Sequence, residues 1–186
     1  MFVVQSFAQQ SPRELAGKER DAVVAELEAK TKAISSLTAK FRQRRETTLL
    51  KDPVESSGRI SFKRSGAIRW EYQKPQNKVI EIKGTSLSVD GVNRGANRMA
   101  KGIATMVSGM LQGGKVADEK TFDFTLFDTG NYYNLKAKPK RRDMQRIMAA
   151  VDISFLKSDG TVRKMILTEK DGNSTVIEFD ELKIEN

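Results

Sequence analysis

Short segments with a two-residue apolar period constrain the fold of this 186-residue chain more than any other feature. The first begins at Leu37, where Leu37, Ala39 and Phe41 alternate with polar or basic side chains. Turn-forming pairs such as Asp90-Gly91 separate most of the segments. Because strands this close in sequence pair antiparallel through hairpins, the pattern predicts a large meandering antiparallel sheet. The later strands are expected at Arg59 to Arg64, Ala67 to Tyr72, Lys78 to Lys83, Ser86 to Val89, Phe122 to Phe127, Tyr132 to Ala137, Val151 to Leu156, Val162 to Thr168 and Thr175 to Ile184.

A helix is expected before the first strand. The segment Ser11-Pro12-Arg13-Glu14 has a capping serine, a proline suited to the first helical position and a glutamate that can complete a capping box. Val23, Leu27 and Ile34 then form an apolar stripe at helical spacing. The pattern predicts a helix that begins at this segment and packs its stripe on an apolar surface.

Two further helical segments interrupt the strands, at Met99 to Leu111 and at Arg141 to Met148. Since a sheet of about ten strands must curl or close, we expect a barrel whose mouth or interior is covered by helices. The apolar face of the first segment comprises Met99, Ile103, Met106, Val107 and Met110. Methionine adapts to variable contacts and the glycines in this segment weaken the helix, which favours a movable lid. From this stretch alone, an ordinary core helix is an equally good interpretation.

Composition restricts the chemistry. The chain has no cysteine and no histidine, which excludes disulfides, zinc sites built on these residues and histidine bases. A carboxylate mechanism or a Ser–Lys pair remains open, but no spaced motif supports either. We therefore expect neither an enzyme nor a cofactor. The net charge of +9 indicates affinity for anionic partners without identifying them.

The chain is expected to form one domain over residues 11–186. Residues 1–10 combine a short apolar stretch with a small residue at a plausible cleavage point, as at the end of a secretory signal. A disordered or helical N-terminus is the alternative. No apolar run approaches the ~18 residues that cross a bilayer.

The hairpin from Gly58 to Tyr72 is the most informative segment. Its first strand places Ile60, Phe62 and Arg64 on one face, so that a basic residue closes an apolar row. The second strand carries another apolar and aromatic row. We expect the two rows, with the preceding strand, to line an apolar cavity through Phe41, Ile60, Phe62, Ile68, Trp70 and Tyr72. Taken alone, Arg64 would be interpreted as reaching solvent at the strand end.

From about Ala33 to the C-terminus, the sequence resembles the LolA family of outer-membrane lipoprotein carriers. Ile34 to Gln43 is similar to the family's first helix-to-strand junction, and Gly58 to Tyr72 to its R-W-x-Y hairpin. Tyr133 to Lys140 resembles the Y-x-L-x-x-P-K strand, and Ile177 to Asn186 the last strand. The proline that follows the hairpin arginine in the family is Ser65 here.

The resemblance implies an α+β fold, mainly β: a curled, incomplete antiparallel barrel covered by an N-terminal helix and an inserted lid helix. Its cavity would take acyl chains of lipoproteins from an inner-membrane ABC lipoprotein exporter. The carrier would cross the periplasm as a monomer and deliver the lipoproteins to the outer membrane. Whether a separate acceptor receives them there is left open by the sequence. By motif position, Arg64 corresponds to the residue that holds the lid closed when the cavity is empty.

Two other functions remain as alternatives. The first is a sensory or protein-binding module of the same fold. The second is a basic nucleic-acid-binding β-domain, which should expose aromatic side chains among its basic residues.

The basic runs Arg42 to Arg45 and Lys136 to Arg142 are interpreted as solvated surface, with an acidic partner or anionic headgroups as the functional alternative. No specific nucleic-acid binding is expected.

Overall fold

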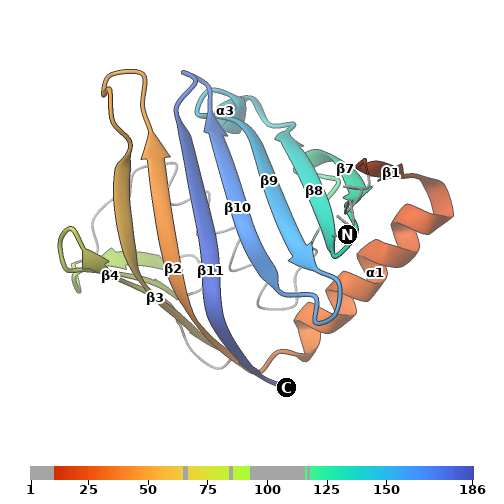
Figure 1. Ribbon diagram of the computed structural model, residues 1–186, viewed down its shortest axis with the longest axis horizontal. Coiled ribbons are helices and arrows are strands. Elements are labelled where there is room, and N and C mark those ends of the chain that lie inside the picture. Colours follow the sequence, from red (N-terminus) through yellow and green to blue (C-terminus); the bar gives the residue numbers. More distant parts are fainter. Residues whose placement is uncertain (1–10, 65–66, 84–85, 93–115, 117) are drawn as a thin grey trace, which may run out of the picture.

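A strongly curled antiparallel sheet dominates the computed structural model, which describes residues 11–64, 67–83, 86–92, 116 and 118–186 (Figure 1). Within these residues the sheet has eleven strands. They are β1 (Arg13–Leu15), β2 (Ser36–Glu46), β3 (Val54–Lys63), β4 (Ile68–Lys74), β5 (Lys78–Lys83), β6 (Ser86–Val89), β7 (Phe122–Asp128), β8 (Tyr132–Pro139), β9 (Met148–Leu156), β10 (Val162–Glu169) and β11 (Ser174–Glu185). Helix α1 spans Gly17–Ala33, and α3 spans Arg142–Gln145.

The meandering antiparallel sheet predicted from the sequence consists of two series of hairpins. Strands β2 to β6 form one series of hairpins and β7 to β11 form another, and the sheet order is β1-β7-β8-β9-β10-β11-β2-β3-β4-β5-β6. The two series are joined where the last strand, β11, pairs with β2. A pairing between segments so far apart in the chain cannot be inferred from local turn signals.

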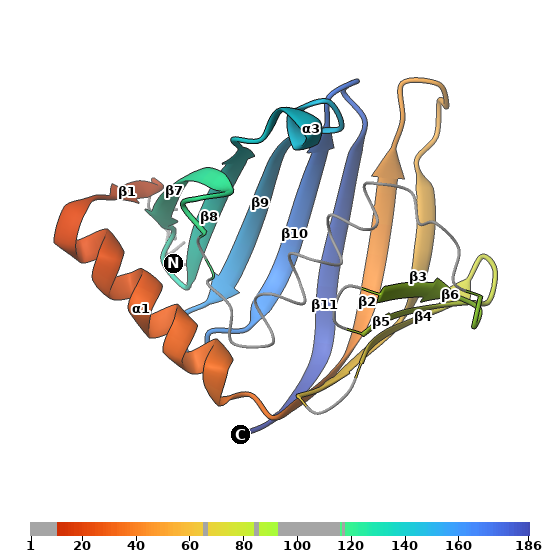
Figure 2. The same ribbon diagram turned by 180° about the vertical axis from the view of Figure 1, so that it is seen from behind.

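The core lies on the concave face of the curled sheet, which Figure 2 shows from its open side. One cross-strand row runs in register from β7 to β11, and all of its side chains are buried. The two-residue period predicted from the sequence is therefore the alternation between this apolar face and the convex outer face. The row consists of Leu126, Leu135, Ile153, Met165 and Ile177.

The expected incomplete barrel is confirmed. The two ends of the described sheet, β1 and β6, pair with β7 and β5 respectively and not with each other. Strands β4 to β6 fold over toward the concave side, and α1 lies across the opposite part of the open side (Figures 1 and 2).

The lid candidate at 99–111 lies outside the described residues, as do residues 1–10. None of the helices described has the length and apolar character needed to cross a bilayer.

The predicted helix start at Ser11 to Glu14 is wrong. Arg13–Leu15 forms β1 and pairs with β7, which buries the Leu15 side chain against the core. Helix α1 begins at Gly17, whose φ is 53°. Its N-cap residue, Ala16, makes no side-chain capping hydrogen bond. Tertiary strand pairing thus overrides the capping motif. The predicted stripe is confirmed in part, since Val23 and Leu27 are buried on α1 and Ile34 lies just beyond its end.

The helix expected at Arg141 to Met148 is shorter than predicted. Helix α3 spans Arg142–Gln145 and buries none of its residues. Met148 is buried as the first residue of β9, where it pairs with Glu169 of β10. The last residue of the predicted helix, Met148, is therefore the first residue of strand β9.

Gly58 allows the close approach of β3 and β4. The strand register shifts between Ser57 and Gly58, and a Cβ added at Gly58 would lie 1.9 Å from the Glu71 carbonyl oxygen. On the other side of β3, Gly58 is paired with Phe41 of β2. The absent side chain therefore permits both the backbone approach and the ring contact between Phe41 and Tyr72, whose centroids are 5.0 Å apart.

We predict that Gly58→Ala lowers the free energy of unfolding by about 1–3 kcal/mol, because backbone atoms must move to admit the methyl group. Urea denaturation followed by circular dichroism measures the change. Ser61→Ala, on the convex face of the same strand, is the control and should stay within about 0.5 kcal/mol of the parent. Equal stability of the Gly58 variant and the parent would show that the strands are not held as closely as the structure places them.

Candidate apolar binding site

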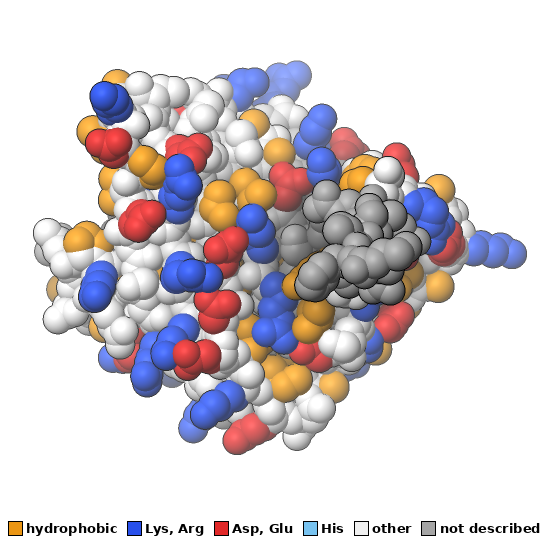
Figure 3. Space-filling model, viewed as in Figure 1, with side chains coloured by type: hydrophobic (Ala, Val, Ile, Leu, Met, Phe, Trp, Pro, Cys, Tyr) orange, Lys and Arg blue, Asp and Glu red, His pale blue; other side chains and the backbone are white. Residues whose placement is uncertain are grey.

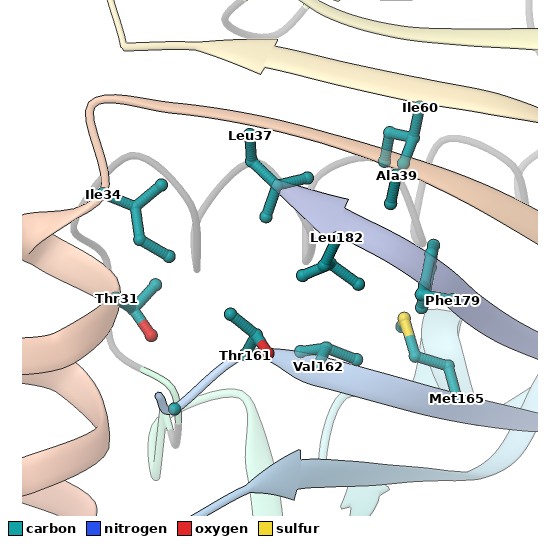
Figure 4. A pocket seen from close by; sticks show the side chains of 11 residues that line it. Thr31, Ile34, Leu37, Ala39, Ile60, Thr161, Val162, Met165, Phe179 and Leu182 are labelled. Atoms are coloured by element: carbon teal, nitrogen blue, oxygen red, sulfur yellow. The ribbon is translucent and has the colours of Figure 1, made fainter. Parts of the chain in front are cut away.

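An apolar pocket opens on the concave side, between α1 and the sheet (Figure 4). Its walls come from the end of α1 and from strands β2, β3, β10 and β11. Its volume is about 60 Å³, smaller than the ~300–1,000 Å³ typical of ligand pockets. The pocket is therefore too small to hold a long acyl chain. The described lining residues are Thr31, Ile34, Leu37, Ala39, Ile60, Gly160, Thr161, Val162, Met165, Phe179 and Leu182.

A β-bulge in β11 shapes one wall of this pocket. The register with β2 shifts between Asp180 and Lys183, and Glu181 has a φ of 49°. Before the bulge, the odd-numbered residues of β11 as far as Phe179 face inward. After the bulge, the inward positions are even-numbered, and Leu182 lines the pocket. Without the extra residue, the alternation would direct Glu181 inward. The bulge thus keeps the wall apolar.

The end of α1 is fitted tightly to the turn between β9 and β10. Lys30 Nζ donates a hydrogen bond to the Lys157 carbonyl oxygen at 2.7 Å. A Cβ on Gly160 would approach the Lys30 Cβ to 2.8 Å, and the φ of Gly160 is 70°. This contact places Thr31 and Ile34 of the α1 end over the pocket (Figure 4). Movement of this end would change the size of the pocket.

An aromatic cluster borders the pocket. The rings of Phe41 and Trp70 have centroids 5.0 Å apart, and Trp70 makes an edge contact with Phe179 at 5.9 Å. Phe179 links the cluster to the pocket because it lines the pocket as well. The Tyr72 hydroxyl donates to Gln43 Oε1 at 3.1 Å, and burial raises the pKa of Tyr72 to about 12. This phenol therefore stays neutral at physiological pH.

The structure brings the six predicted cavity residues together on the concave face. Ile60 lines the pocket described above. Phe41, Phe62, Ile68 and Trp70 are buried in the adjoining core, and Tyr72 is partly buried against it. Their role in binding a ligand stays a prediction. The predicted lid residues, Met99, Ile103, Met106, Val107 and Met110, lie outside the described residues.

Several pocket residues were not predicted as site residues. Leu37 and Ala39 share the inward face of β2 with Phe41, so the two-residue period could have identified them. Met165 and Phe179 reach the pocket only because β11 pairs with β2, a long-range contact. Leu182 depends on the bulge. For these three, no local pattern in the sequence gives their position.

The model of the family described as "Outer membrane lipoprotein carrier protein LolA" matches residues 32–186, which include β2 to β11 and most of the pocket. The chain belongs to the LolA family. The match begins at the end of α1, so β1 and most of α1 precede the matched region.

Individual matches include one relative in sequence and two solved structures. The outer-membrane lipoprotein carrier protein of Chromobacterium violaceum is 29% identical over 173 residues, covering 90% of this chain and 80% of that protein. The structure of the Pseudomonas aeruginosa MucA/MucB complex gives a TM-score of 0.54 at 13% identity. There the match covers 90% of this chain but only 58% of the other. An uncharacterized conserved protein from Thermus thermophilus gives 0.51 at 12% identity, covering 90% and 88% of the two chains. The two structural matches show a shared fold.

Arg64, which directly follows β3, binds the end of α1. One of its guanidinium nitrogens donates to the Lys32 and Ile34 carbonyl oxygens, each at 2.5 Å. Its backbone N–H donates to the Ser35 carbonyl oxygen at 2.9 Å. These bonds satisfy carbonyl groups at the C-terminal end of the helix, where a cation is also favoured by the helix dipole. Arg64 therefore fixes the part of α1 that covers the pocket.

On the convex face, basic and acidic side chains are interspersed (Figure 3). Arg42 in the first basic run lies 3.1 Å from Asp180, and Arg69 lies 2.5 Å from both Glu71 and Glu81. Such exposed pairs contribute little to stability.

Among the described residues, no cluster of three or more Asp or Glu side chains is arranged to hold a metal ion.

Proposed function

We propose that this chain is a periplasmic carrier that shields the acyl chains of lipoproteins on its concave face and transports them between the inner and outer membranes. The observation that carries the proposal is an apolar pocket, bordered by the aromatic cluster and covered by α1, in a chain of the LolA family. Burial of each acyl methylene contributes ~0.8 kcal/mol, so binding needs no cofactor and no catalytic group. The lipoprotein would come from an inner-membrane ABC exporter and pass to the outer membrane.

The small volume of the pocket supports a cycle of opening and closing. A cavity of about 60 Å³ does not accommodate a long acyl chain, so loading requires neighbouring elements to move. The end of α1 is one such element, and we retain the segment 99–111 as the proposed lid. When the cavity is empty, these parts pack on its walls and offset part of the gain from binding lipid. This competition makes release feasible.

The nucleic-acid alternative receives little support from the side-chain arrangement. A binding surface for single strands needs exposed aromatic rings beside basic groups. Phe41, Phe62 and Trp70 are instead buried on the concave face, while Arg42 and Arg44 of the first basic run form ion pairs outside it.

We predict that the protein binds a fluorescent long-chain acyl probe saturably, and that Leu182→Asp weakens this binding by about tenfold or more, because a carboxylate would be desolvated in the pocket. Ile166→Asp is the matched control, since Ile166 is similarly half-buried but lies on the convex face. Probe titration measures both affinities. Absence of saturable binding, with no acyl chain in a lipid extract of the purified protein, would instead favour a protein-binding module of the same fold.

We further predict that Arg64→Leu still accepts lipoprotein but releases it more slowly. The charged hydrogen bonds to α1 contribute ~1.5–3 kcal/mol, so their loss shifts a balanced equilibrium toward the open, loaded form by one to two orders of magnitude. Transfer from preloaded carrier to acceptor membranes measures the rate. Arg69→Leu, on the convex face, is the control and should change the rate little. An unchanged rate for the Arg64 variant would remove Arg64 from the release step.

A further inference from the structure

The hairpin between β2 and β3 presents leucines to solvent. Leu49 is 92% exposed and Leu50 is 55% exposed, and Val54 at the start of β3 is 42% exposed. These are three of the five strongly exposed large hydrophobic side chains among the described residues. Exposed apolar side chains grouped at one loop indicate an interaction site more strongly than scattered ones do.

The leucines sit on an ordered support. Thr48 N donates to Asn173 Oδ1 at 2.8 Å, which joins the hairpin to the β10–β11 turn. Lys170 N in that turn donates to the Ile147 carbonyl oxygen at 3.0 Å, which joins it to the segment that contains α3. The three loops therefore form one continuous edge at the same end of the sheet (Figures 1 and 2). We name residues 44–53, 140–147 and 169–173 the hairpin rim.

The hairpin rim is basic. It contains eight basic and five acidic residues, a net charge of +3. Three of the acidic residues, Glu46, Asp143 and Glu169, are in ion pairs with arginines of the rim. Four exposed basic side chains form no ion pair with any described residue: Lys51, Arg142, Arg146 and Lys170. Both basic runs found in the sequence contribute to this surface.

We propose that the hairpin rim docks on the surface of a lipid bilayer that contains anionic headgroups, with Leu49 and Leu50 inserted into the interface. A protruding pair of leucines without surrounding aromatic side chains differs from the core of a protein–protein interface, which is enriched in aromatic residues. A small apolar insertion and a basic surface are two weak signals that together favour binding to an anionic membrane surface. Docking also suits a protein that must approach membranes to exchange lipoproteins, and this part of the inference rests on the proposed carrier function.

The test is flotation of the purified chain with protein-free vesicles, made either of phosphatidylcholine alone or of equal parts phosphatidylcholine and phosphatidylglycerol. We expect binding to the mixed vesicles, much weaker binding to phosphatidylcholine alone, and a decrease as salt is raised. The double variant Leu49→Ser/Leu50→Ser should lose about tenfold or more in affinity for the mixed vesicles. Arg142→Glu/Arg146→Glu should lose a similar factor, since each cation near an anionic surface contributes to binding.

Matched controls lie at the other end of the sheet. Tyr132→Ser removes an exposed apolar side chain there, and Lys63→Glu/Lys183→Glu reverses two exposed charges. Lack of vesicle binding by the parent chain would overturn the proposal, as would equal loss in rim and control variants. Acyl-probe binding should persist in the rim variants. Probe binding without vesicle binding would refute docking but not the carrier function, whereas vesicle binding without probe binding would refute the carrier function.

Discussion

The pairing of β2 with β11 is the contact on which the rest of the structure depends. It unites two series of hairpins that would otherwise be separate sheets, and it places Phe41 directly opposite Phe179 on the concave face. Next to this pair, the bulge directs Leu182 into the pocket. The same pairing extends to the end of α1, where Ser35 N and Oγ both donate to the Glu185 carbonyl oxygen, at 2.7 and 2.9 Å. The pocket thus exists because the first long strand and the last strand meet.

Much of the architecture follows from short-range properties of the sequence. The alternation of apolar and polar residues fixes which side chain of each strand faces inward, and hairpin turns fix the neighbours within each series. Three features escaped prediction because nonlocal contacts decide them. The pairing with β7 extends Arg13–Leu15 despite a good helix-capping motif, Met148 is drawn into β9, and β11 closes on β2.

The candidate site likewise has one part that local sequence patterns predict and another part that depends on long-range contacts. The face that carries Phe41, Ile60 and Trp70 could be predicted from the strand period alone. The position of the pocket could not, since its walls combine α1 with strands from both ends of the chain. Arg64 shows the limit of a local interpretation. Taken alone, it would be interpreted as reaching solvent at the strand end, whereas the structure shows that its partners include the carbonyl groups of Lys32 and Ile34 at the end of α1.

The proposed carrier function rests on the apolar walls and small volume of the pocket and on the helix end fixed by Lys30, Ser35 and Arg64. Trp70, the only tryptophan of the chain, reports on this site because its ring contacts Phe179 in the pocket wall. The most direct measurement is therefore quenching of Trp70 fluorescence by a long-chain acyl ligand brominated along its chain. The account predicts saturable quenching with the same concentration dependence as ligand binding. Saturable binding that leaves the fluorescence of Trp70 unchanged would contradict it, because the acyl chain would then lie elsewhere on the protein.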